Sequence, residues 1–197
     1  MNINDVFVFL NVFVGDMTEA DELIAKDSSS FNRRTYIRSS LSLIEACTWQ
    51  IKQACLMFNS PNRATNLSDK DREFLKEKNA KGKNKFTPIY ESIIETNILF
   101  NKVFFGSNIN LELEKQPGQC FLKKAIEIRN NITHPKQSNA YIISDEHIEV
   151  CRKTTNWYSD IVLKYIDELK DHQRIYDEFC FIELNGIDYD EEIDYPE

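Results

Sequence analysis

Hydrophobic positions recur at alternating steps of four and three residues along much of the chain, which is the spacing of one face of an α-helix. The clearest case runs from about residue 29 to residue 58, with the stripe Ile37, Leu41, Ile44, Thr48, Ile51, Cys55 and Phe58. Arg38, Glu45 and Lys52 each fall one residue beyond a stripe position and border it. The Ser-Pro-Asn sequence at 60–62 is expected to stop this helix.

Capping residues mark further helices. Ser68 is a predicted N-cap, Thr87 followed by Pro88 has the order of an N-cap and a first helical residue, and Ser144 precedes the last long helix. The expected ranges are 69–78, 89–105, from near 119 to the residue before Pro135, and 145 to about 171.

The N-terminal run VFVFLNVFV at 6–14 is apolar but has only nine residues and includes Asn11. It is too short to cross a membrane, and Asp5 stands where a signal peptide would carry basic charge. We expect a buried helix or strand here and no membrane partner.

Five glycines and five prolines in 197 residues are too few for a protein built from strands and turns. The sequence therefore predicts an all-α fold, a mostly antiparallel bundle of four long helices with short extra helices. Residues 1–182 are expected to form one domain. Residues 183–197 form an acidic tail, either disordered or a docking segment.

The net charge of −8 is unevenly distributed. From Gln173 onward, nine acidic residues face one basic residue, Arg174, so this end carries the whole surplus and the rest is near neutral. A basic face that coats duplex DNA is not indicated, whereas a local RNA-contacting patch is compatible.

The five cysteines are widely spaced and sit mostly in apolar helical patterns. They are expected to be buried free thiols of a reducing compartment, which favours a cytoplasmic protein. Their spacing lacks the pairs typical of zinc sites, so we expect no metal and no cofactor.

The segment RNNITHP at 129–135 is the main candidate site. On the helix from Gln119, Arg129 falls near the middle of the apolar arc made by Phe121, Leu122, Ala125, Ile126, Ile128 and Ile132. A guanidinium facing inward needs a partner. One interpretation is structural, an ion pair with Glu45 or Glu95 or a cap on its own helix end.

The other interpretation is chemical. Imidazole gains and loses a proton near neutral pH, so His134, at a helix end that Pro135 terminates, can act as acid or base on RNA. Arg129 can hold the phosphate, and Asn130 can orient the phosphate or the histidine. A second proton carrier would come from a two-fold dimer. His147 and His172 are expected on the surface.

An α-helical bundle with Arg129, Asn130, three residues and then His134 resembles the HEPN superfamily, as does RRTYIRSSLSLIEA at 33–46. The resemblance covers about residues 29–170. It implies a metal-independent, dimeric endoribonuclease of toxin–antitoxin or antiphage defence systems, in which Arg129 and His134 are catalytic and Asn130 supports them. Glu45 and Arg38 match polar residues that the family places on its first helix, and an antitoxin or defence protein is an implied partner.

Two alternatives remain open. The same bundle can be a non-catalytic module that dimerises or binds a partner protein through its acidic tail. Many members of the family are not nucleases and serve as dimerisation or nucleotide-binding modules. A small-molecule or nucleotide-binding bundle has less support, because the sequence has no glycine-rich phosphate loop.

Overall fold

The computed structural model describes residues 10–58, 67–78, 81–105, 117–135 and 142–185, and the side chains of 10, 58, 117, 172, 173 and 175–185 fall outside that description. Within these ranges the chain forms six α-helices and no strand. The predicted all-α fold is confirmed. The helices are α2 (Leu10–Lys26), α3 (Ser30–Phe58), α4 (Asp69–Leu75), α5 (Ile89–Phe104), α6 (Pro117–Thr133) and α7 (Asp145–Asn185).

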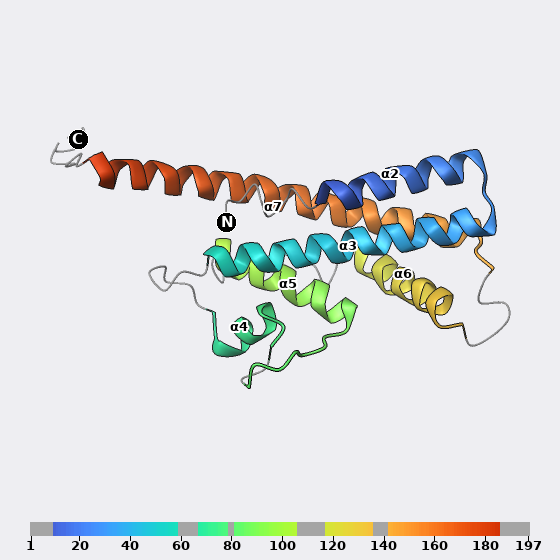
Figure 1. The fold of residues 1–197 in the computed structure, drawn as a ribbon, viewed down its shortest axis with the longest axis horizontal. Helices are drawn as coiled ribbons and strands as arrows, with labels where there is room; N and C mark the ends of the chain where they lie inside the picture. Colours follow the sequence, from blue (N-terminus) through green and yellow to red (C-terminus); the bar gives the residue numbers. More distant parts are fainter. Residues whose placement is uncertain (1–9, 59–66, 79–80, 106–116, 136–141, 186–197) are drawn as a thin grey trace.

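Helix α3 lies at the centre and contacts each of the other five helices (Figure 1). Helices α2 and α6 run antiparallel to α3, whereas α5 and α7 run parallel to it (Figure 1). The most extensive helix pairs, α2 with α3 and α6 with α7, are antiparallel, and the bundle has one long helix more than the four predicted. The added helix is α2.

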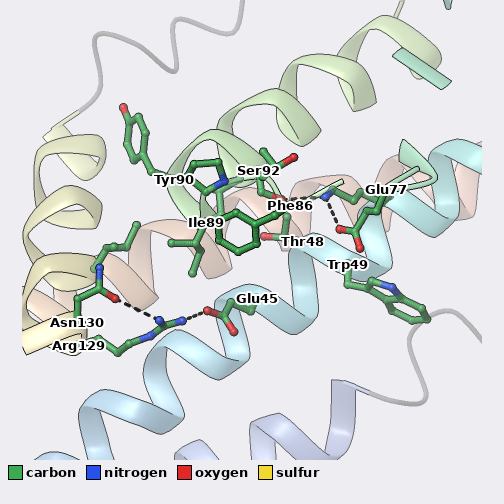
Figure 2. A pocket seen from close by; sticks show the side chains of 15 residues that line it. Glu45, Thr48, Trp49, Glu77, Phe86, Ile89, Tyr90, Ser92, Arg129 and Asn130 are labelled. Carbon is green, nitrogen blue, oxygen red and sulfur yellow. Dashed lines mark hydrogen bonds and ion pairs between the residues drawn. The ribbon is translucent and has the colours of Figure 1, made fainter. Parts of the chain in front are cut away.

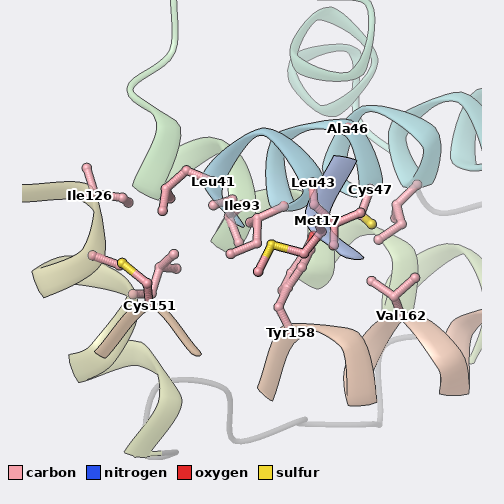
Figure 3. Close-up of a cluster of buried hydrophobic side chains, with 14 of the residues drawn as sticks. Met17, Leu41, Leu43, Ala46, Cys47, Ile93, Ile126, Cys151, Tyr158 and Val162 are labelled. Carbon is pink, nitrogen blue, oxygen red and sulfur yellow. The ribbon is translucent and has the colours of Figure 1, made fainter. Parts of the chain in front are cut away.

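The core forms where the apolar stripe of α3 meets α5, α6 and α7 (Figure 3). Ile37, Leu41, Ile44 and Ile51 are at most 1% exposed, as the sequence pattern predicts. Full burial of one such side chain stabilises the fold by about 1.5–3 kcal/mol. Their partners include Ile93, Phe100, Leu122, Ala125, Tyr158 and Leu169.

Buried hydroxyl groups fix α7 against its neighbours. Ser40 and Thr155 share a hydrogen bond, and Thr48 Oγ1 lies 2.8 Å from the hydroxyl oxygen of Tyr158. Burial raises the pKa of Tyr158, so its hydroxyl stays neutral. Because each polar pair joins one turn of α3 to one turn of α7, these contacts specify the register of the two parallel helices.

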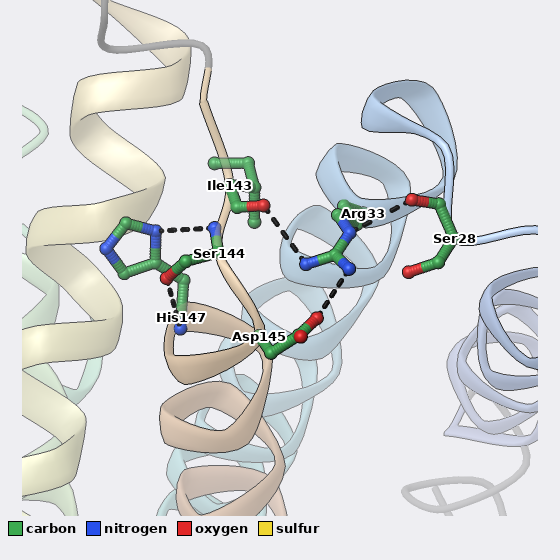
Figure 4. A network of polar contacts seen from close by, with 6 residues as sticks. All are labelled: Ser28, Arg33, Ile143, Ser144, Asp145 and His147. Carbon is green, nitrogen blue, oxygen red and sulfur yellow. Dashed lines mark hydrogen bonds and ion pairs between the residues drawn. The ribbon is translucent and has the colours of Figure 1, made fainter.

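The start of α7 is anchored to α3 through Arg33 (Figure 4). Its guanidinium donates to the carbonyls of Ser28 and Ile143 and pairs with Asp145. Ser144 caps the helix by accepting from the backbone N–H of His147, as predicted, and His147 Nδ1 accepts from the Ser144 N–H. His147 is thus a partly buried residue that takes part in the cap of α7, a role that the sequence did not predict.

Three predicted helix boundaries need correction. Pro88, not Thr87, is the N-cap of α5, since its ψ of 141° is extended and the helix begins at Ile89. Helix α4 has the predicted Ser68 cap but ends at Leu75, because Glu77 turns the chain with a φ of 53°. Helix α7 continues to Asn185, past the predicted end near 171.

The N-terminal run only partly matches its prediction. Its described part, from Leu10 onward, is helical, but Val12 and Val14 are exposed, so the expected burial is wrong for them. Phe13 of the run is partly buried and packs against the core, which Met17 and Ala20 further along α2 join as buried residues. Residues 6–9 of the run and 186–197 of the predicted tail lie outside the described residues.

The expected buried thiols are confirmed for Cys47, Cys55 and Cys151. Burial raises the pKa of Cys47 and of Cys151 to about 12, so both remain protonated. Cys120 is exposed on the outer face of α6, where the prediction of burial is wrong. The Cys180 side chain lies outside the described residues.

Candidate functional site

Arg129 reaches from the last turns of α6 to the middle of α3. Its Nη2 donates a hydrogen bond to Oε1 of Glu45, and the two side chains are 27% and 43% exposed. Of the two carboxylates that the sequence offered as partners, Glu45 is the one that Arg129 contacts. The apolar arc thus turns Arg129 toward α3, and Glu45 provides the counter-charge.

Asn130 holds the guanidinium from a second direction. Arg129 Nη1 donates to its side-chain oxygen over 3.2 Å (Figure 2). A guanidinium has five N–H groups. The contacts with Glu45 and Asn130 use two of them, so three stay available among the described contacts to donate to a further anion.

His134 lies immediately beyond the last residue of α6. Its backbone N–H still bonds to the carbonyl of Asn130 over 2.8 Å, and Pro135 follows. The imidazole is exposed, and no side-chain hydrogen bond or ion pair to another described residue holds it. The structure therefore places His134 about one turn beyond Arg129, accessible to a ligand from solvent.

Arg38 is exposed on α3, two turns before Glu45 on the same side of the helix. Because α6 runs antiparallel to α3, this part of α3 lies toward the end of α6 that carries His134 (Figure 1). Glu45 is thus brought directly to Arg129. Arg38 is placed toward His134 but makes no hydrogen bond or ion pair with a described residue.

A pocket of about 500 Å³ opens beside the Arg129–Glu45 pair, between α3, α5 and α6. Arg129 and Asn130 lie at one end of the pocket and Glu77 at the other (Figure 2). His134 is not among its described lining residues. The walls between the two ends include Thr48, Trp49, Phe86, Ile89, Tyr90, Ser92, Ile93 and Ile126.

The far end of the pocket contains a buried lysine that the sequence placed only at the border of the helix stripe. The Lys52 side chain is 2% exposed. Its Nζ lies 2.8 Å from both Glu77 Oε1 and Ser92 Oγ, and 4.6 Å from the centre of the Phe74 ring. These contacts compensate the buried ammonium group and tie the segment after α4 to α3.

Sequence reasoning missed the pocket because its walls come from separate segments. Trp49 lies off the apolar stripe of α3, and Phe86 ends the basic segment KGKNKF. An aromatic residue off the core stripe, together with one inside a lysine-rich loop, was the available signal. Only the fold shows that the two flank one pocket.

Neither a membrane span nor a metal site appears in the described part of the chain. No described helix has the length and apolar character needed to cross a bilayer. Among the described residues, no group of three or more histidine, cysteine, aspartate and glutamate side chains is placed to hold a metal ion. Comparison with known proteins found no matching family model, no matching curated protein and no matching solved structure.

Proposed function

We propose that this chain is a HEPN-type endoribonuclease that acts as a homodimer without a metal ion, in a toxin–antitoxin or antiphage defence system. One arrangement supports the proposal above others. A guanidinium, oriented by Glu45 and Asn130 and retaining donors that no other described residue uses, lies about one helical turn from an exposed histidine. Oriented positive charge and an accessible proton carrier are what RNA transesterification requires.

In the proposed reaction the RNA 2′-oxygen attacks the adjacent phosphorus and the 5′-oxygen leaves. One imidazole takes the proton of the 2′-hydroxyl, and a second gives a proton to the 5′-oxygen. Arg129 stabilises the extra negative charge on the phosphorane between these steps. The products are a 2′,3′-cyclic phosphate and a 5′-hydroxyl, and water can later open the cycle to a 3′-phosphate.

The two imidazoles are His134 from each of two copies. Within one chain, His147 Nδ1 accepts from the Ser144 N–H as part of the α7 cap, so we assign the second proton carrier to His134 of the other copy. A two-fold axis near the end of α6 would bring both copies of His134 and both copies of Arg129 to one interface. Exposed Arg38 would add positive charge there.

The test is cleavage of unpaired RNA by the purified chain in EDTA, with the two products identified by their end groups. His134→Gln should lower the rate at least a hundredfold, which is the usual contribution of a general acid or base. His147→Gln is the matched control, and it should cut at the parent rate. Equal cutting by the His134→Gln protein would refute the assignment.

A non-catalytic helical module is the second candidate, and the Arg129–Glu45 pair itself favours it. An ion pair between α6 and α3 has a structural use whether or not RNA binds. In that case the purified chain cuts no RNA, and Arg129→Ala lowers the melting temperature while leaving any dimer or partner complex intact.

A further inference from the structure

Two large aromatic side chains stay in water beside the pocket. Phe86 is 90% exposed and Trp49 is 46% exposed, although each lies only a few positions along the sequence from residues of the core. Figure 2 shows Phe86 beside Ile89 over the pocket, with Trp49 near the Glu77 end. Exposed aromatic side chains around a concave site can stack against a flat ligand.

A lysine-rich segment leads directly to this pocket. Residues 76–85 contain one acidic residue, Glu77, whose charge is paired with that of Lys52. The segment folds back on itself, since Lys85 N–H donates to the Glu77 carbonyl over 2.8 Å and Lys78 forms a bridge with Asn84. Its exposed lysines are Lys76, Lys78, Lys81, Lys83 and Lys85.

Building on the proposed ribonuclease activity, we propose that this pocket binds one nucleobase of single-stranded RNA and that the lysine segment binds the phosphates of neighbouring nucleotides. Aromatic faces beside a positively charged track are the features that bind unpaired nucleic acid. A paired base cannot reach such a pocket, because base pairing and stacking hold it inside the duplex. The pocket thus selects unpaired RNA and places a phosphate at Arg129.

The polar groups at the Arg129 end of the pocket can form hydrogen bonds with the edge of a bound base. Asn130 accepts from Arg129 through its side-chain oxygen, which fixes the amide and leaves its NH₂ group as a donor. Glu45 offers an acceptor oxygen at the same end of the pocket. One donor and one acceptor beside a stacked base favour some bases over others, so the pocket sets a base preference next to the cut.

Stacking can be measured through Trp49. The chain has two tryptophans, so Trp157→Phe leaves Trp49 as the sole tryptophan. In a His134→Ala, Trp157→Phe protein, short unpaired RNAs of a single base type should quench Trp49 fluorescence saturably. Phe86→Ala should weaken binding about tenfold, because one stacked base is lost. Phe31→Ala removes another exposed phenylalanine and should leave binding unchanged.

The salt dependence tests the lysine segment. For single-stranded nucleic acid, each phosphate contact adds about 0.7 to the slope of log affinity against log salt. In the protein with both Lys78→Gln and Lys85→Gln, this slope should decrease in magnitude by about 0.7 for each of the two lysines that contacts a phosphate. Lys164→Gln, Lys170→Gln is the control on the exposed face of α7, and it should keep the slope.

The outcomes separate this pocket from the proposed reaction. Quenching by RNA in a chain that cuts nothing supports the pocket and refutes the nuclease. Cutting that is unaffected by Phe86→Ala, with no quenching of Trp49, supports the nuclease and overturns the pocket. If nucleoside monophosphates bind as tightly as the oligonucleotides and the lysine substitutions change nothing, the pocket takes a free nucleotide, and the RNA proposal is also overturned.

Discussion

The carboxylate of Glu45 on α3 accepts a hydrogen bond from the guanidinium of Arg129, 84 residues later on α6. Both side chains keep part of their surface in water, so the pair contributes about 1 kcal/mol or less to stability. Its larger effect is on orientation, because Glu45 and Asn130 together leave the guanidinium few directions. Because the effect on stability is small and the effect on orientation is larger, the structural role and the functional role of the Arg129–Glu45 pair can be measured separately.

Glu45→Gln removes the counter-charge and keeps the shape of the side chain. Denaturant unfolding should show a loss of about 1 kcal/mol or less. Under the proposed function, RNA cleavage should fall more than this loss explains, because Arg129 is no longer held toward the phosphate. Glu127→Gln, exposed on α6, is the control for both measurements. A loss of several kcal/mol with no change in cleavage would assign the pair to stability alone.

The Lys52–Glu77 pair predicts an asymmetry between its two partners. Lys52 is buried and Glu77 is 54% exposed, so the two single substitutions leave different groups behind. Glu77→Ala leaves an ammonium in the core without its counter-charge, and we expect a loss of about 3 kcal/mol. Lys52→Met leaves only a carboxylate that water can solvate, and the loss should be about 1 kcal/mol.

Equilibrium unfolding of both variants and of the double variant measures this asymmetry. In the double variant, Lys52→Met removes the buried ammonium that Glu77→Ala leaves without a counter-charge. The double variant should therefore lose less unfolding free energy than the sum of the two single losses. Equal losses for the two single substitutions would mean that Lys52 reaches water and is not buried at the pocket floor.

The sequence predicted the helices and the inward position of Arg129 because both depend on spacing within one segment. The stripe of α3 fixes which residues are buried, and the same periodicity put Arg129 on the inner arc of α6. The pocket could not be predicted in this way. Phe86, Trp49 and Lys52 come together only because Glu77 turns the chain after α4 and bonds back to α3.

The capping box of α4 predicts a loss of stability in acid. Burial alone would raise the pKa of Asp71, but hydrogen bonds from Lys102 and from Ser68 outweigh it, and the pKa falls below its ordinary value of 3.8. A carboxyl whose pKa is lower in the folded state stabilises the fold above the unfolded pKa. That stabilisation is lost as the pH falls through the folded pKa.

Unfolding free energies measured from about pH 6 down to about pH 3 should therefore fall more steeply for the parent than for Asp71→Asn. The side chain of the Asp71→Asn variant cannot ionise, so at the upper end of this pH range its unfolding free energy should be lower than that of the parent. Asp69→Asn is the control, since Asp69 is exposed and its ion pair among the described residues is with Arg72, three residues later. Parallel curves for the parent and Asp71→Asn would contradict the prediction.

Gly118 near the start of α6 lies against the ring of Trp157 on α7. A Cβ atom at this position would fall 2.1 Å from Cδ2 of that ring, far inside van der Waals contact. Gly118→Ala should thus lower the unfolding free energy by about 1–3 kcal/mol, the usual cost of overpacking. The gain in helix propensity, about 1 kcal/mol at most, does not offset this clash.

Gly15→Ala is the matched control, because Gly15 also lies in a helix but a Cβ atom there meets nothing within 4 Å. It should raise stability by about 0.5–1 kcal/mol, so the same substitution has opposite signs at the two positions. Trp157→Leu in the Gly118→Ala background should recover part of the loss, because a smaller side chain makes room for the methyl group. If the effects of Gly118→Ala and Trp157→Leu on the unfolding free energy were additive, Gly118 and Trp157 would not be in contact.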